Sequence, residues 1–264
     1  MINKERVKCR FNKSSVDYNK YAKVQVTMAS RLMNMINKSD IKTILEIGCG
    51  TGNLTNMLLD KFRNVSLTVM DLSEKMLDET RKNISVRNLE NIEFICHDGE
   101  TCELNKKYDL IISNATFQWF NSLEESIKKY IDLLNENGQL LISTFGEDTF
   151  IELEKSGIKA ARELNVEHNF KLRRSFVGID EIENIIKNQN INYKVVDEKL
   201  KEYHKSSRDF IKSVKKIGAN TCGSEGGITP PRVIKKVLEV YDRDFVENKF
   251  VYSTYHCIYI SINK

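Results

Sequence analysis

This 264-residue sequence lacks the features that mark membrane, secreted and linker-rich proteins. No apolar run is longer than a strand, and a membrane-spanning helix needs roughly 20 apolar residues, so we expect no membrane span. The opening segment MINKERVKCRFNKSS contains no apolar stretch, so we expect no signal peptide. The two prolines are adjacent, at Pro230 and Pro231, which excludes proline-rich linkers.

Metal-ligand and disulfide patterns are also missing. The four histidines do not cluster near the six cysteines, and no Cys-x-x-Cys pair occurs. This arrangement predicts neither a metal site nor a disulfide framework. Reduced thiols are typical of cytoplasmic proteins, so we expect a cytoplasmic location. The cysteines are Cys9, Cys49, Cys96, Cys102, Cys222 and Cys257.

Neither sign of charge dominates. The chain has 41 Lys and Arg against 37 Asp and Glu, a net charge of +4, and no long basic block. We therefore expect no nucleic-acid partner, while the slight positive charge is compatible with an acidic protein partner. Hydrophobic residues make up 41% of the chain, enough to fill the core of one large α/β domain.

Short apolar segments alternate with amphipathic segments up to residue 145. This repeated alternation predicts an α/β fold with a doubly wound, mostly parallel sheet that is covered on both faces. The expected strands are 43–48, 65–71, 92–98, 108–114 and 139–145, and the expected helices are 53–62, 73–87 and 122–135.

The flanking segments follow other patterns. An amphipathic helix is predicted over 15–37, and residues 147–190 are charged and mostly helical. The segments 191–204 and 250–262 alternate as strands do, and should pair as an antiparallel strand at one end of the sheet. Helices are expected at 178–186, 209–218 and 230–248. We expect one domain over 1–264, made of an N-terminal helical cap (1–40), a ligand-binding core (41–146), a helical lid insertion (147–190) and a C-terminal part that closes the sheet (191–264).

A glycine-rich segment, EIGCGTG at 46–52, follows the first expected strand and precedes a helix. Glycines there let the backbone turn tightly and approach a ligand closely. The spacing is G-x-G-x-G, whereas a dinucleotide site has G-x-G-x-x-G. A carboxylate at Glu46 would repel a pyrophosphate and attract an ammonium or sulfonium group. The segment therefore favours a cationic ligand, although Glu46 taken alone can be a surface acid.

Polar residues also end the next three expected strands, at the sheet edge where open α/β folds bind ligands. Asp71 comes about 20 residues after the glycine turn, where a carboxylate can accept from both ribose hydroxyls; its alternative role is to cap the next helix. Asp98 can accept from the exocyclic amine of adenine, and its neighbour His97 is expected to pack rather than catalyse. The segment 114–120, NATFQWF, supplies polar and aromatic groups.

These four motifs, taken in their order along the chain, make residues 40–145 similar to the class I S-adenosylmethionine-dependent methyltransferases. The resemblance implies a Rossmann-like, seven-stranded sheet and S-adenosylmethionine as cofactor. The residues that it assigns to the cofactor are Glu46, Gly48, Cys49, Gly50 and Gly52 at the methionine end, Asp71 at the ribose, Leu72 and Met76 against the adenine, Asp98 and Gly99 at the adenine edge, and Asn114 through its backbone. Cys49 is expected to be a small buried residue, not a nucleophile.

Further motifs are similar to the malonyl-[acyl-carrier protein] O-methyltransferases of biotin synthesis, and they run through nearly the whole chain. They are FNKSSVDY (11–18), YAKVQ (21–25), SNATFQW (113–119), STFG (143–146) with EL (152–153), RSF (174–176), KIGAN (216–220) and TY (254–255). Thr116 and Phe117 depart from the family, which has smaller residues there. The resemblance implies methyl transfer to the free carboxylate of a malonyl thioester on acyl-carrier protein or coenzyme A.

Such an acceptor explains why no catalytic set is visible. A carboxylic acid with a pKa near 4 is ionised at pH 7, so no general base is needed, and we name no catalytic residue. Arg173 and Arg174 are the candidates for binding the acceptor carboxylate, because guanidinium groups bind carboxylates bidentately. Each can instead be a solvated lid residue or a contact to the carrier.

Three aromatic residues have two open roles each. Tyr18 and Tyr21 either fold over the cofactor, with Tyr18 also touching the acceptor, or pack their helix on the sheet. Trp119 either walls the acceptor pocket or packs in the core. The basic residues Lys155, Lys159, Arg162, Lys171, Arg173, Arg174, Lys212, Lys215 and Lys216 either attract an acidic carrier or lie on solvated helix faces. A methyltransferase for another small carboxylate and a non-catalytic S-adenosylmethionine-binding module are the alternative functions, and the oligomeric state stays open.

Overall fold

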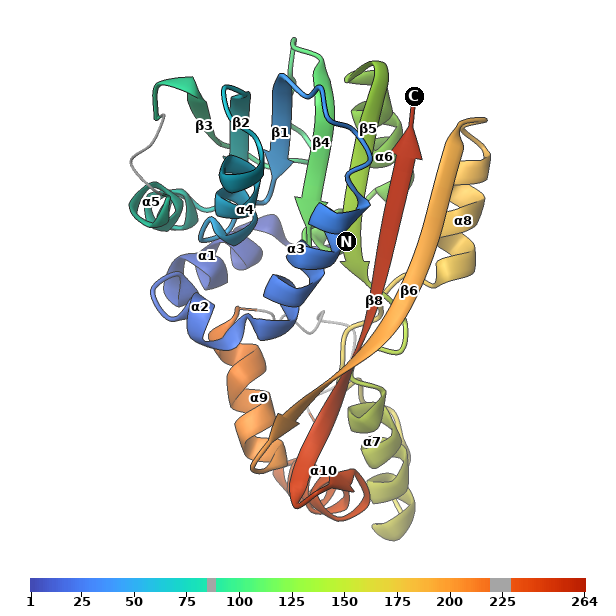
Figure 1. The fold of residues 1–264 in the computed structure, drawn as a ribbon. Helices are drawn as coiled ribbons and strands as arrows, with labels where there is room; N and C mark the ends of the chain where they lie inside the picture. The colour runs from blue at the N-terminus through green and yellow to red at the C-terminus, as the bar shows by residue number, and fades with distance from the viewer. Residues whose placement is uncertain (85–88, 219–228) are drawn as a thin grey trace.

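A mostly parallel β-sheet forms the centre of the structure (Figure 1). The computed structural model describes residues 1–84, 89–218 and 229–264, and within them the strand order is β3-β2-β1-β4-β5-β8-β6, with the short β7 paired to β8. The strands are β1 Thr43–Ile47, β2 Ser66–Asp71, β3 Ile92–Cys96, β4 Tyr108–Asn114, β5 Leu134–Phe145, β6 Asn192–His204, β7 Val246–Glu247 and β8 Phe250–Asn263.

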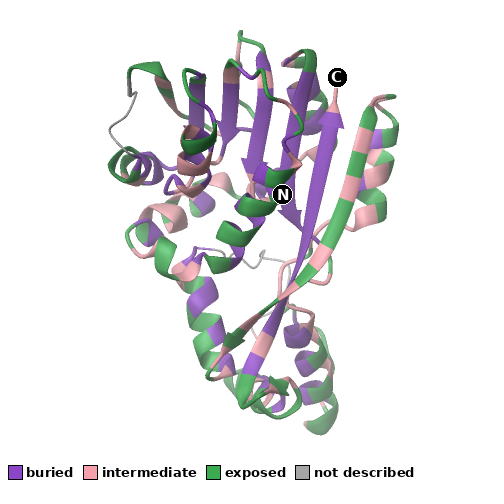
Figure 2. Cartoon of the chain, viewed as in Figure 1, coloured by how far each residue is buried: buried purple, intermediate pink, exposed green. Residues whose placement is uncertain are grey.

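The expected topology is confirmed. Strands β3, β2, β1, β4 and β5 are parallel, and β8 runs antiparallel to both β5 and β6. The antiparallel pairing of 191–204 with 250–262 is thus present, although these strands are not consecutive, because the described residues between them include helices and β7. In Figure 2 the central strands are buried along their length, while the edge strand β6 alternates between exposed and less exposed residues.

Helices cover both faces of the sheet because successive strand residues point to opposite sides. Ile44 packs with the helices on one face, whereas its neighbour Leu45 packs with those on the other. The first face carries α3 Lys23–Met35, α4 Asn53–Lys61 and α5 Glu74–Asn83, and the second carries α6 Leu123–Asp132 and α8 Ile179–Lys187. Single-turn helices lie at Leu89–Asn91 and Phe117–Trp119. None of the described helices is long and apolar enough to cross a membrane.

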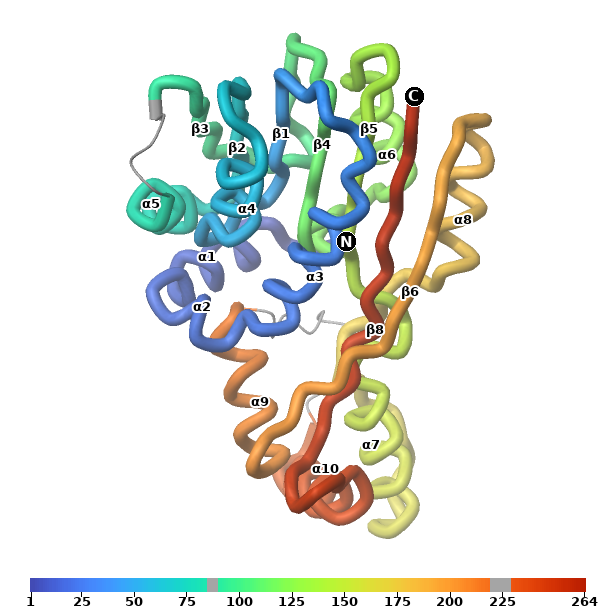
Figure 3. The backbone as a smooth tube through the Cα atoms, viewed as in Figure 1, coloured from blue at the N-terminus to red at the C-terminus, as the bar shows by residue number. Residues whose placement is uncertain are grey.

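The N-terminal segment differs from the expected single helix over 15–37. It forms α1 Lys4–Ser14, α2 Tyr18–Tyr21 and α3, and the backbone changes direction between them (Figure 3). Asn3 begins α1 by accepting a hydrogen bond from the Arg6 amide. Pattern analysis missed α1 because it buries only Val7 and Ser14. Its apolar side meets the candidate site described below, and not the core of the sheet.

A second group of helices lies beyond the end of the sheet, against the twisted ends of β6 and β8 (Figure 1). These helices are α7 Ile151–Glu163, α9 Ser207–Lys216 and α10 Pro231–Asp244. The rings of Phe210 and Tyr241 stack at 5.6 Å in their shared core. The expected insertion 147–190 is therefore divided: α7 joins this group, while α8 packs on the sheet through Ile182 and Ile186. The predicted positions 85–87, Ala219, Asn220 and Cys222 lie outside the described residues.

Candidate active site

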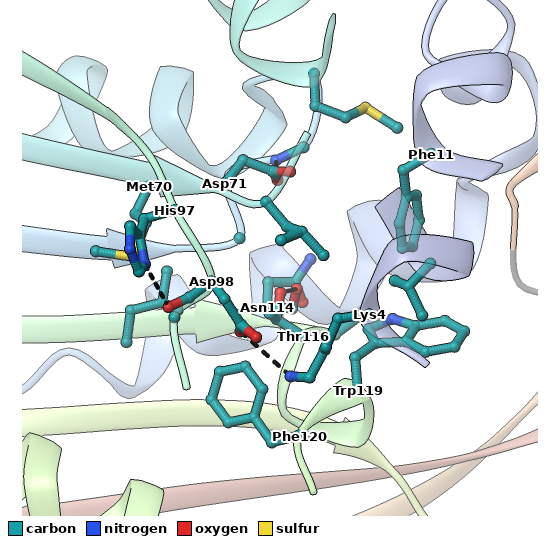
Figure 4. A pocket seen from close by; sticks show the side chains of 18 of the residues that line it. Lys4, Phe11, Met70, Asp71, His97, Asp98, Asn114, Thr116, Trp119 and Phe120 are labelled. Atoms are coloured by element: carbon teal, nitrogen blue, oxygen red, sulfur yellow. Dashed lines mark hydrogen bonds and ion pairs between the residues drawn. The ribbon is translucent and has the colours of Figure 1, made fainter. Parts of the chain in front are cut away.

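A crevice of about 630 Å³ opens at the carboxyl ends of β1, β2, β3 and β4 (Figure 4). Parallel strands bring their carboxyl ends to one edge, so residues distant in sequence meet there. The structure brings the following predicted residues to the walls of this crevice: Tyr18, Gly48, Gly50, Asp71, Leu72, Met76, Asp98, Gly99, Asn114 and Trp119. It does not bring Tyr21, Glu46, Cys49, Gly52, Arg173 or Arg174 there.

The glycine turn is held against the second strand. The amides of Gly48 and Cys49 both donate to the carbonyl of Met70, at 2.7 and 3.1 Å. Gly48, Gly50 and Gly52 all have positive φ angles, which favour glycine. A Cβ atom on Gly48 would lie 2.0 Å from Thr116 Oγ1, whereas one on Gly50 would meet nothing within 4 Å. Gly50 therefore faces open space, and a ligand can approach its backbone closely.

Asp71 links this turn to the end of β2. Its Oδ2 accepts from the Gly50 amide at 2.9 Å, and its Oδ1 accepts from the Ser73 amide at 2.8 Å. Ser73, not Asp71, caps α5, since its hydroxyl accepts from the Met76 amide. Burial raises the pKa of Asp71 to about 6, although its backbone donors oppose the shift. The result is a rigid acceptor inside the crevice.

The far end of the crevice is closed by a lysine that the sequence analysis missed. Lys4 of α1 lies 3.2 Å from Asp98 Oδ1 and 2.6 Å from Glu100 Oε2, and its ammonium sits 4.9 Å from the Phe120 ring centre (Figure 4). Lys4, Val7 and Phe11 all line the crevice, so α1 covers it. A single lysine in a polar segment carries no sequence signal for this role.

Tyr18 and Asn114 also line the crevice. Burial, together with the nearby Asp71 carboxylate, raises the pKa of Tyr18 above its usual range, so its hydroxyl stays protonated. The amide of Asn114 donates to the Gln25 carbonyl and accepts from the Ser143 hydroxyl, at 3.0 and 2.7 Å. The Asn114 side chain is therefore used in holding α3 to the sheet.

The structure does not support the expectation that Glu46 attracts a positively charged ligand. Its side chain is only 1% exposed and accepts a hydrogen bond from the Thr55 hydroxyl of α4 at 2.7 Å. Burial raises the pKa of Glu46 to about 8. Cys49 is likewise buried, 3.5 Å from Thr80 Oγ1, as expected of a small core residue. Gly52 also faces Thr80, and it does not line the crevice.

Trp119 separates the crevice from a second cavity of about 350 Å³, since it lines both. The second cavity is mainly apolar, and its aromatic walls are Phe145, Phe150, Phe176 and Tyr255. These four residues come from three separate segments of the chain, and the sequence analysis did not assign them to a site. Phe11 meets Trp119 edge-on from the crevice side, with ring centres 5.6 Å apart.

Arg174 brings one positive charge into the second cavity. Its guanidinium stacks on Trp119, with Cζ 4.6 Å from the ring centre, and its Nη2 donates to the Gln118 carbonyl. Its Nη1 is buried and has no hydrogen-bond partner among the described residues. Burial lowers the pKa of Arg174 to about 10, so the group stays charged at neutral pH.

Arg173 points elsewhere, so the two candidate arginines have different surroundings. It pairs with Glu154 and donates to the carbonyls of Glu147 and Thr149. It does not line the second cavity. The arrangement thus offers an anion one partly buried, incompletely bonded cation, Arg174. It stacks on Trp119, which lines both the crevice and the second cavity. Among the described residues there is no cluster of three or more side chains that could hold a metal ion.

Comparisons with known proteins agree with this geometry. The methyltransferase domain family matches residues 44–138. The malonyl-[acyl-carrier protein] O-methyltransferase of Acetivibrio thermocellus is 37% identical, over 100% of this chain and 95% of its own, and that of Bacillus anthracis is 35% identical, over 100% and 98%. Two solved structures share the fold. The YcgJ protein of a Bacillus has a TM-score of 0.63 and 14% identity, over 90% of this chain and 98% of its own. A protein of Bacillus halodurans assigned as a methyltransferase has a TM-score of 0.62 and 12% identity, over 90% of this chain and 99% of its own.

The buried position of Glu46 makes stability depend on pH. Its pKa is about 8 in the folded chain against an ordinary 4.5, so between these values the folded state holds a proton that the unfolded state has lost. Stability from this site is therefore lost as pH rises. Glu46→Gln keeps the acceptor for Thr55 without the charge, so we expect its stability relative to wild type to increase from pH 5 to pH 9 in urea unfolding. A constant difference would show that Glu46 is not a buried acid.

Proposed function

Because the chain belongs to the malonyl-[acyl-carrier protein] O-methyltransferase family, we propose that it transfers the methyl group of S-adenosylmethionine to the free carboxylate of a malonyl thioester. Similarity over the full length of the curated relatives supports this activity. The product would be a malonyl methyl ester, which primes pimelate formation in biotin synthesis.

The observation that carries the proposal is the unpartnered Nη1 of Arg174 in an apolar cavity. Leaving a buried donor without a partner costs roughly 1–3 kcal/mol, and more for a charged group. A carboxylate placed against Arg174 removes that cost and pairs the buried charge. Neutral acceptors such as amines would leave it unpaired.

The crevice on the other side of Trp119 fits S-adenosylmethionine. Its walls combine apolar side chains with a few polar groups, as small-molecule sites do. Asp71 offers acceptors for ribose hydroxyls, Leu72 and Met76 offer apolar contacts for a flat base, and the open space at Gly50 allows close approach. Asp98 and Gly99 lie where the adenine edge is expected. When bound, the cofactor supplies an electrophilic methyl group on a positively charged sulfur.

The residues of this chain then need to position the acceptor and exclude water. The malonyl carboxylate has an ordinary pKa near 4, so it reaches the site ionised and no base is required. Arg174 holds one end of it, and the aromatic walls keep the cavity dry, which favours a reaction that neutralises opposite charges. Correct alignment of the reacting atoms contributes up to about 7–11 kcal/mol in ideal cases.

An acyl-carrier protein is the proposed source of the acceptor, and the cytoplasm is the proposed location. Carriers are acidic, and exposed cations such as Lys155 and Arg162 lie on α7. Part of the basic surface is already used, since Lys159 pairs with Asp244 and Lys216 with Asp17. The remaining positive charge supports attraction of an acidic partner that weakens with salt.

Turnover tests the function directly. The protein is incubated with methyl-labelled S-adenosylmethionine and either malonyl-carrier protein or malonyl-coenzyme A, with acetyl-coenzyme A as the control that lacks a free carboxylate. We expect a labelled methyl ester from the malonyl thioesters only. Preferential labelling of another small dicarboxylate would show that the acceptor is not a malonyl thioester. Cofactor binding without any methyl transfer would show that the chain is a binding module.

Arg174→Ala should raise the KM for the malonyl thioester roughly 10- to 100-fold, the range for losing a hydrogen bond to a charged group. The KM for S-adenosylmethionine should change less than about twofold, because Arg174 does not line the crevice. Arg63→Ala, an exposed arginine between α4 and β2, is the matched control. Equal increases in both constants would remove Arg174 from the acceptor site.

Binding of S-adenosylhomocysteine should tighten as pH rises through about 6, since ribose hydroxyls donate better to an ionised Asp71 than to a protonated one. His97 also lines the crevice, so the variant Asp71→Asn is needed to assign the effect. In calorimetry from pH 5 to pH 8 we expect this variant to bind more weakly at pH 8 and to lose most of the pH dependence. An unchanged profile would refute the ribose assignment.

A further inference from the structure

A third cavity, of about 540 Å³, shares a wall with the acceptor cavity. Arg174 lines both of these cavities, just as Trp119 lines both the crevice and the acceptor cavity. The three spaces are therefore neighbours, with Trp119 and Arg174 at the two boundaries. The third cavity is walled by Glu154 of α7 and by the segment 168–175, which connects α7 to α8. No role for it follows from the methyl-transfer chemistry described above.

Close packing against α7 shapes this cavity. A Cβ atom on Gly157 would lie 2.6 Å from Leu172 Cδ1 and 3.4 Å from the Phe170 ring. Gly157 therefore lets the connecting segment lie directly on the helix, and Phe170 is buried there. The same packing makes Phe170 and Leu172 an apolar part of the cavity wall.

The polar part of the wall is positively charged. Lys171, Arg173 and Arg174 contribute three cations, against one carboxylate, Glu154, which pairs with Arg173. His168 and Ser175 add further hydrogen-bonding groups. The cavity thus combines an apolar surface with a net positive charge, next to the place proposed for the malonyl carboxylate.

We propose that this cavity binds the phosphopantetheine arm of the acceptor, with its phosphate against Lys171 and Arg173. The inference rests on the proposed function, in which the malonyl group is a thioester. In both carrier protein and coenzyme A the thioester sulfur belongs to a pantetheine chain, which has a branched apolar segment and ends in a phosphate ester. Phe170 and Leu172 match the apolar segment, and the cations match the phosphate.

The test compares two acceptors that differ by one phosphate, malonyl-phosphopantetheine and malonyl-pantetheine. We expect the KM to be roughly tenfold lower for the phosphorylated one, as for one charge-assisted contact. Lys171→Ala should raise the KM for malonyl-phosphopantetheine about 5- to 10-fold with little change in kcat, and that for malonyl-pantetheine less than twofold. Lys128→Ala, an exposed lysine of α6 that does not line the cavity, is the control.

Calorimetry of phosphopantetheine and pantetheine with the S-adenosylhomocysteine-loaded protein separates this inference from the proposed function. Tighter binding of phosphopantetheine that Lys171→Ala abolishes supports the site. Equal affinities, or equal KM values with methyl ester formed from both acceptors, overturn it and leave the methyltransferase activity standing. Absence of methyl ester from every malonyl thioester, by contrast, overturns the proposed function. Malonyl-coenzyme A and malonyl-carrier protein then show which source of the arm is used.

Discussion

The stacking of Arg174 on Trp119 is the interaction on which the proposed site depends. Burial of a guanidinium is costly, and here the ring face and the Gln118 carbonyl offset only part of the cost, because Nη1 has no partner among the described residues. The charge nevertheless persists at neutral pH, since its lowered pKa is still about 10. We propose that this incompletely bonded cation selects an anionic acceptor and orients it toward Trp119 and the crevice.

The crevice itself depends on the parallel sheet. Four strands end at one edge, the glycine turn is bonded to β2 through Met70, and Asp71 joins the turn to the next helix. Helix α1 covers these groups and is anchored by the ion pairs of Lys4 with Asp98 and Glu100. Two compartments result, one polar and one mainly apolar. This division suits a reaction between a positively charged donor and an anionic acceptor that needs no base.

Much of the fold and of the crevice could be predicted because the signals are local. Strand periodicity located β1 to β5, and the glycines and Asp71 stand at fixed places after strands. The role given to Glu46 failed for a reason visible in the same periodicity: Glu46 alternates with Leu45 and shares the face of Ile44, which is covered by α3 and α4. The alternation that buries the hydrophobic residues of this strand also buries the acid that lies among them.

The acceptor side could not be predicted at this level. Arg173 and Arg174 are adjacent and chemically identical. Only the contact of Arg174 with Gln118, 56 residues away in the single-turn helix Phe117–Trp119, gives one of them the cavity. Lys4 and the aromatic walls depend on similar long-range contacts.

A crystal structure with S-adenosylhomocysteine and a malonyl thioester tests the account most directly. It should place the acceptor carboxylate against Arg174, with one of its oxygens in line with the methyl position on the cofactor sulfur past the edge of the Trp119 ring. A carboxylate bound away from Arg174, or a thioester outside the second cavity, would contradict it.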